Sequence, residues 1–103
     1  MKVVDEEIFG PVVCAMPFEK TEEVTAQMNN SPFGLAGAIW TQDLSKAHRM
    51  ARAMKSGTVW INCYNVFDAA LPFGGYKQSG WGREMGREVF ELYTQVKSVC
   101  IKI

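Results

Sequence analysis

Hydrophobic residues along this chain gather into short runs that are separated by polar and glycine-rich segments. Four runs have the length and composition of β-strands, and they span residues 12–16, 35–40, 58–63 and 96–103. The run 58–63 does not alternate with polar residues, which predicts a strand buried on both faces. The run 96–103 does alternate, and it places Val99, Ile101 and Ile103 on one face of the predicted strand.

Helical patterns occupy the segments between these runs. Thr21 is the predicted N-cap of a short helix that ends within residues 29–34. Asp43 is the predicted N-cap of a clearer helix, and Gly57 suits the end of that helix. The apolar residues of this second helix recur at helical spacing and are Leu44, Ala47, Met50, Ala51 and Met54. A third helix is predicted over residues 84–93.

Predicted strands and helices therefore alternate through the first half of the chain. This order is typical of an α/β layer with a mostly parallel sheet. No internal repeat, low-complexity tract or linker divides the sequence, so we expect a single domain over residues 1–103.

Charge and composition exclude several classes of function. Lys plus Arg number 11 and Asp plus Glu number 11, so the net charge is zero and no run of like charges indicates a nucleic-acid or membrane surface. No apolar stretch approaches the roughly 20 residues of a membrane span. The N-terminal residues do not have the pattern of a secretion signal. We expect a cytoplasmic protein without nucleic-acid or membrane partners.

The usual catalytic and metal-binding motifs are missing. Cys14, Cys63 and Cys100 have no metal-ligand or redox spacing, so we expect small buried hydrophobic residues in a reducing compartment. The segment 80–86 approaches a dinucleotide fingerprint, but its last gap is one residue too long and it follows a loop. His48 has no nucleophile linked to it in sequence. We predict no metal site and no catalytic residue in this chain.

Five longer signatures occur in order along the chain. They are EEIFGPV at 6–12, NSPFGLAG at 30–37, GTVWIN at 57–62, PFGGYKQSG at 72–80 and GRE at 82–84. Together the signatures resemble the C-terminal part of the aldehyde dehydrogenase superfamily, at similar spacings and over essentially the whole chain. The resemblance implies a partial three-layer α/β sandwich with a mostly parallel sheet, taken from the catalytic domain of such an enzyme.

The resemblance also assigns a cofactor role to two residues near the start. Glu7 matches a family residue that binds the nicotinamide-ribose hydroxyls, and an ionised carboxylate has acceptor sites for both hydroxyls of a diol. Phe9 matches a residue that packs near the nicotinamide. From the residues alone, the two would instead form a charged turn before a strand, with Phe9 in the core.

The loop 64–83 is long for a compact domain and is therefore a functional candidate. By resemblance, Phe67 and Phe73 line the mouth through which the aldehyde passes, although the two rings could instead only hold the loop to the domain. Asp68 lies between them and could favour a polar or cationic substrate. The loop glycines Gly74, Gly75, Gly80 and Gly82 are expected to supply unusual backbone angles.

Members of the family use a cysteine nucleophile and a glutamate base, and both lie upstream of the segment that this chain resembles. The resemblance therefore implies an NAD- or NADP-dependent oxidation of an aldehyde to a carboxylic acid in the complete enzyme, with this chain alone inactive and binding the cofactor weakly or not at all. It further implies a homo-oligomer in which residues 96–103 form the oligomerisation strand.

Two alternatives belong to other classes of protein. The chain could be a non-catalytic assembly or regulatory module that docks on a full-length aldehyde dehydrogenase. It could also be a free-standing binder of small aromatic molecules, provided that residues 64–83 are ordered by themselves.

Overall fold

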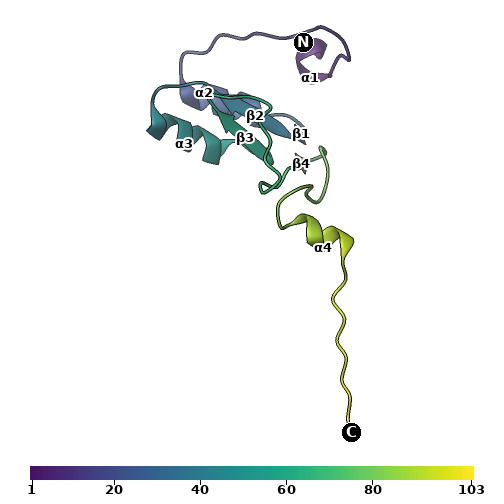
Figure 1. Cartoon of the computed structure of the whole chain (residues 1–103). Helices are drawn as coiled ribbons and strands as arrows, with labels where there is room; N and C mark the ends of the chain where they lie inside the picture. The colour runs from purple at the N-terminus through teal and green to yellow at the C-terminus, as the bar shows by residue number, and fades with distance from the viewer.

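The computed structural model describes all residues from 1 to 103. The N-terminal segment passes over a central β–α–β unit, and the C-terminal segment extends away from this unit (Figure 1). The elements, in order, are α1 (Lys2–Asp5), α2 (Thr21–Asn29), β1 (Phe33–Gly34), β2 (Ala36–Ile39), α3 (Leu44–Ala53), β3 (Thr58–Ile61), β4 (Tyr76–Lys77) and α4 (Val89–Tyr93). The Cα radius of gyration is 18.4 Å, whereas about 13 Å is typical of a compact domain of this length.

The sheet consists of two separate pairs. β2 and β3 are parallel, in a register that runs from Ala36 opposite Thr58 to Ile39 opposite Ile61. β1 and β4 are antiparallel and only two residues long. The predicted α/β class, with a parallel sheet and packed helices, is confirmed, while the short antiparallel pair was not predicted.

Helix α3 connects the two parallel strands and provides most of the small core. The carboxylate of Asp43 accepts a hydrogen bond from the backbone N–H of Lys46 at 2.9 Å, which confirms the predicted N-cap. Ala47 and Met50 are buried, whereas Leu44 at the start of the predicted apolar stripe is exposed. Only five of the 103 residues are buried, and Trp60 of β3 is the largest of them.

Two predicted strands form no ladder in this structure. Residues 12–16 follow α1 without pairing, and residues 96–103 leave the body as a drawn-out tail (Figure 1). A strand is stabilised by hydrogen bonds to a neighbouring strand, and no strand of this chain pairs with either segment. The strand predicted over 58–63 ends at Ile61 and is only partly buried apart from Trp60, which the loop rings of Tyr64 and Phe67 cover.

Two helix predictions need correction as well. Helix α2 begins at Thr21, but its N-cap is Lys20 and no side chain caps the helix. The helix predicted over 84–93 begins only at Val89. Met85 and Gly86 have φ angles of 57° and 62°, so the chain turns there before a helix can start.

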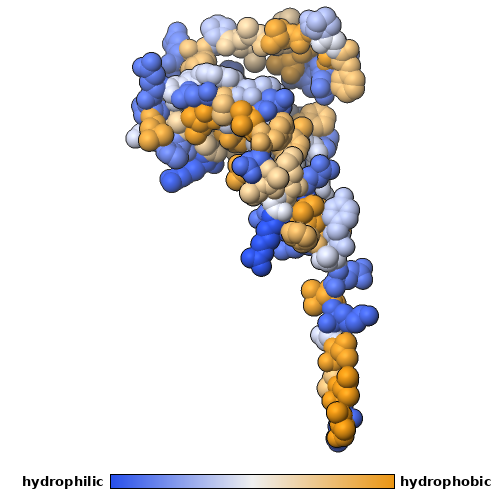
Figure 2. All heavy atoms as spheres, viewed as in Figure 1, coloured by the Kyte–Doolittle hydropathy of each residue, from blue (hydrophilic) through white to orange (hydrophobic).

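Many large hydrophobic residues of this chain are exposed, among them Phe9, Trp81 and Val96. Figure 2 shows hydrophobic residues on the body and along much of the C-terminal tail. None of the helices is both long and apolar enough to cross a membrane.

Candidate functional site

The long loop begins where β3 ends, and Asn62 sets its direction. Asn62 has a φ angle of 54°, a left-handed conformation that asparagine tolerates better than most residues. The Asn62 side chain accepts a hydrogen bond from the backbone N–H of Thr41 and donates one to the Thr41 carbonyl, both at 2.9 Å. These two hydrogen bonds join the ends of β2 and β3 at the start of the loop.

A line of aromatic rings connects the core to this loop. The Trp60 ring lies edge-on to Tyr64 at 5.1 Å and to Phe67 at 5.7 Å, measured between ring centroids. Phe67 in turn lies edge-on to Phe73 at 5.2 Å. The structure therefore brings together the two predicted mouth residues, and Phe67 keeps 48% of its surface exposed.

Phe73, the last ring of this line, is also held through its backbone, by hydrogen bonds to Glu84. The N–H and the carbonyl of Phe73 bond to the carbonyl and the N–H of Glu84, each at 2.7 Å. The neighbouring Arg83 donates from Nη1 to the carbonyls of Gly75 and Gly82, at 3.0 and 2.7 Å. Sequence reasoning gave Arg83 no role; its guanidinium has several N–H donors and no acceptor, so it can bond two loop carbonyls at once.

The loop glycines serve two different purposes. Gly80 and Gly82 have φ angles of 131° and 80°, as expected. Gly74 and Gly75 do not have positive φ angles, so the expectation of unusual angles is wrong for these two. Their role is close packing, since a Cβ on Gly57 would overlap the Gly74 carbonyl and a Cβ on Gly74 would crowd Arg83.

Asp68 forms a local turn instead of facing a charged partner. Its carboxylate accepts a hydrogen bond from the N–H of Ala70 at 2.8 Å, and its carbonyl accepts one from Leu71 at 2.9 Å. This pattern is an Asx-turn, which short acidic side chains commonly form in loops. The exposed carboxylate therefore stabilises this turn of the loop.

Lys77 connects the far end of the loop to helix α2. Its φ angle is 55°, and its Nζ donates to the carbonyls of Asn29 and Ser31 at 3.0 and 2.9 Å.

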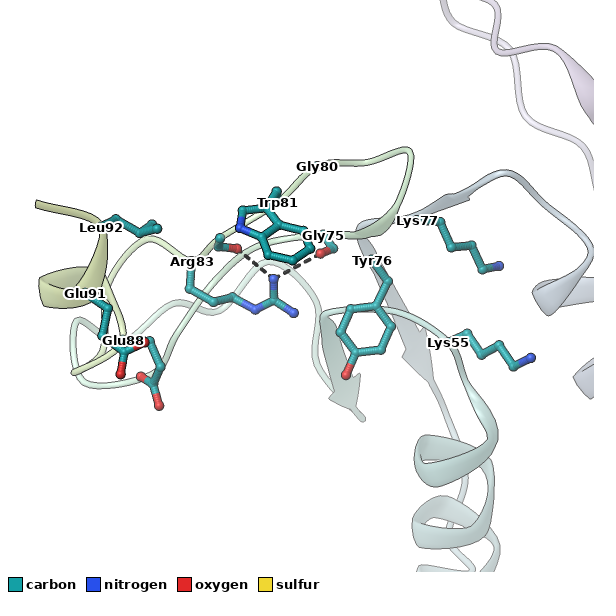
Figure 3. Close-up of a pocket in the computed structure, with 11 residues that line it drawn as sticks. Lys55, Gly75, Tyr76, Lys77, Gly80, Trp81, Arg83, Glu88, Glu91 and Leu92 are labelled. Atoms are coloured by element: carbon teal, nitrogen blue, oxygen red, sulfur yellow. Dashed lines mark hydrogen bonds between the residues drawn. The ribbon is translucent and has the colours of Figure 1, made fainter.

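A hollow of about 860 Å³ lies between β4 and α4. In Figure 3, Lys55 and Lys77 extend to one side of this hollow, Glu88 and Glu91 lie on the other, and Arg83 lies between them beside Tyr76 and Trp81. Phe67 and Phe73 do not line this hollow.

The two predicted cofactor residues lie on the N-terminal arm, residues 6–20. Glu7 is exposed and borders a hollow of about 780 Å³ between this arm and the start of β2. Phe9 is 93% exposed, so the alternative that placed it in a core does not hold for this chain. No hydrogen bond or ring contact joins Glu7 or Phe9 to Phe67 or Phe73.

The cysteines and the histidine form no cluster. Cys14 and Cys100 are exposed and Cys63 is partly buried, so the expectation of buried cysteines is wrong for the first two. The Cys14 thiol contacts only the carbonyl of Val3, at 3.4 Å. His48 is exposed on α3. No three His, Cys, Asp or Glu side chains gather closely enough to hold a metal ion.

Comparison with known proteins points to one family. The model of the aldehyde dehydrogenase family matches residues 1–99. The mitochondrial aldehyde dehydrogenase of Mesocricetus auratus is 53% identical over 103 residues, which are all of this chain and 21% of that enzyme.

Solved structures agree with this match. An aldehyde dehydrogenase from Bacillus cereus, in complex with NAD+, superposes with a TM-score of 0.93 and 56% identity, over 100% of this chain and 21% of that one. The indole-3-acetaldehyde dehydrogenase AldA of P. syringae gives a TM-score of 0.92 and 48% identity over the same shares. The chain thus spans about a fifth of the length of the relatives it matches.

Proposed function

This chain belongs to the aldehyde dehydrogenase family, and we propose that it forms the C-terminal segment of an enzyme that oxidises an aldehyde to a carboxylic acid with NAD or NADP. The observation that supports this most directly is the edge-on pair of Phe67 and Phe73, on a loop that hydrogen bonds hold at both ends. Apolar rings at this point would exclude bulk water from the reacting carbonyl.

The cofactor role of Glu7 is supported by its surroundings in the chain. Its carboxylate is exposed and makes no hydrogen bond within the chain, so both oxygens are free to accept from the hydroxyls of a ribose. Phe9, exposed two residues later, would limit the motion of the nicotinamide. When bound, the nicotinamide cofactor would accept the hydride that leaves the aldehyde carbon.

We propose that the isolated chain does not oxidise aldehydes. By family resemblance, the nucleophile and the base come from upstream segments. None of the three cysteines of this chain has a hydrogen-bonded base beside it, and such a base is what activates a thiol. In the complete enzyme, this chain would supply the Phe67 and Phe73 walls of the mouth and one contact to the cofactor.

A chimera tests this proposal. The chain would replace the matching fifth of the Bacillus cereus aldehyde dehydrogenase, and NADH formation would be followed with a panel of aldehydes. We expect the chimera to oxidise aldehydes, whereas the isolated chain and the Bacillus cereus enzyme without its matching segment do not. A folded chimera that binds NAD but oxidises none of the aldehydes would overturn the proposal, as would turnover by the isolated chain carrying Cys63→Ala.

A second candidate function is an assembly module, and the exposed C-terminal tail is the observation that favours it. Every residue from 91 to 103 is exposed, including Val96, Val99, Ile101 and Ile103. Such a tail could add a strand to a full-length relative. Co-elution of the chain with an intact aldehyde dehydrogenase, with a change in the activity of that enzyme, would favour this function over the first.

A further inference from the structure

Trp60 is the only large aromatic residue that the chain buries. Its side chain is 8% exposed, whereas Trp40 is 65% exposed and Phe67 is 48% exposed. We infer that Trp60 is a positioning residue for the mouth: it holds Phe67 in place, and so determines how well the mouth accepts bulky aldehydes. This inference rests on the proposed function, because it takes Phe67 and Phe73 as walls of the mouth.

The polar end of Trp60 fixes the path of the loop. The indole N–H donates to the carbonyl of Val66 at 2.8 Å. A buried N–H without an acceptor is costly, so the path of the loop that returns the Val66 carbonyl to β3 is favoured. The preceding Asn65 allows this return with a φ angle of 58°. The hydrogen bond therefore also fixes the backbone position of Phe67, the next residue after Val66.

The apolar part of Trp60 then orients the Phe67 ring. The two rings meet at 90° and 5.7 Å, which is the favourable edge-to-face arrangement of aromatic pairs. No backbone hydrogen bond is made by Phe67 itself. Its position thus depends on Trp60, on the adjacent Val66 carbonyl and on the ring of Phe73.

Phe73 does not share this dependence. Its backbone is held by the paired hydrogen bonds to Glu84, to which Trp60 contributes nothing. A change at Trp60 should therefore move one wall of the mouth and leave the other in place. This asymmetry distinguishes a positioning role from general damage to the core.

The chimera described above provides the kinetic test, with Trp60→Phe as the variant and Trp40→Phe as the matched control. Trp60→Phe keeps an aromatic ring and removes the indole N–H. We expect the KM of a bulky aromatic aldehyde to rise about fivefold, the change equivalent to one net hydrogen bond of about 1 kcal/mol. The kcat and the KM for NAD should stay within about twofold, because uniform binding is lost without loss of chemistry. Trp40→Phe should change none of these values.

A double-mutant cycle links the effect to Phe67. In a Phe67→Leu background, Trp60→Phe should no longer raise the KM of the aldehyde, because the residue that it positions is gone. An unchanged KM in Trp60→Phe, or an equal rise in both backgrounds, would overturn the inference. An inactive chimera with Trp60 intact would instead count against the proposed function.

A spectroscopic test on the 103-residue chain does not depend on activity. With Trp40→Phe and Trp81→Phe, Trp60 is the only indole, and its emission reports its burial. We expect Phe67→Leu to shift this emission to the red. Phe33→Leu is the matched control, because Phe33 is also 48% exposed but belongs to β1. Equal shifts in the two variants, or none in Phe67→Leu, would show that Trp60 and Phe67 are not coupled.

Discussion

Asn62 holds Thr41 by both polar atoms of its side-chain amide, at the ends of β3 and β2. One 2.9 Å hydrogen bond runs from the Thr41 N–H to Asn62 Oδ1, and another runs from Asn62 Nδ2 to the Thr41 carbonyl. Because Asn62 also has a positive φ angle, a single residue follows the end of β3, bonds to the end of β2 and directs the chain into the loop 64–83.

Substitution of Asn62 should therefore destabilise the chain in a graded way. Asn62→Gly loses both hydrogen bonds but keeps the left-handed backbone, whereas Asn62→Ala also adds strain of about 1 kcal/mol. We expect a loss of about 1–3 kcal/mol for Gly and a larger loss for Ala, measured by urea unfolding. Equal stability of Ala and Gly variants would mean that the backbone conformation is not a constraint at this position.

The N-cap of α3 should make stability depend on pH. The backbone N–H of Lys46 stabilises the ionised carboxylate and lowers the pKa of Asp43 below its ordinary value of 3.8. A group with a lowered folded-state pKa stabilises the fold above its unfolded pKa. That contribution is lost as the pH falls from above 3.8 through the lower folded value.

The matched variant is Asp43→Asn, which keeps an acceptor for the cap without a titrating charge. Wild type should be the more stable of the two at neutral pH, and the difference should shrink as the pH falls below 3.8. Urea unfolding followed by circular dichroism at several pH values measures this difference. A constant difference across the acid range would rule out Asp43 as its source.

Cofactor binding by the isolated chain should be weak. Glu7 offers one ribose contact, and a single hydrogen bond contributes only about 1 kcal/mol, or somewhat more when it is charged. We expect calorimetry to give a Kd for NAD weaker than about 1 mM. In the chimera, Glu7→Gln should slow hydride transfer, with the neighbouring Glu6→Gln as the control. A low-micromolar Kd for the chain, or an unchanged hydride-transfer rate in Glu7→Gln, would contradict the role proposed for this residue.

The isolated chain should self-associate through its exposed apolar surface. The tail offers unpaired backbone groups beside the row formed by Val99, Ile101 and Ile103, and zero net charge provides no long-range repulsion. Sedimentation at micromolar concentration should show a dimer or a larger species. The double variant with Val99→Lys and Ile101→Lys should form an assembly of lower mass than the wild-type chain does.

The control for the tail adds the same two charges on its other face, as Ser98→Lys with Cys100→Lys. This variant should keep more of the assembly, because it leaves the apolar row intact. A monomeric wild-type chain would show that residues 96–103 do not form an interface by themselves.

Local patterns in the sequence were sufficient for much of the fold. The cap at Asp43 and the helix that follows it depend on residues a few positions apart, and both were predicted, as were the two strands on either side of the helix. The family was also predicted from the order of its signatures, and the comparisons confirm it. Residues 12–16 and 96–103 have the composition of strands, but a strand also needs a partner, and composition does not say whether one is present.

Only the tertiary structure decided how the loop that carries Phe67 and Phe73 is held. The resemblance named Phe67 and Phe73, but it did not show that Trp60 contacts one ring while Glu84 holds the backbone of the other. Likewise, Asn62 and Thr41 lie 21 positions apart, and nothing near either residue predicts their pairing. Short-range caps and periodicities follow from local sterics and hydrogen bonding, whereas such distant contacts exist only once the chain has folded and brought specific donors, acceptors and rings together.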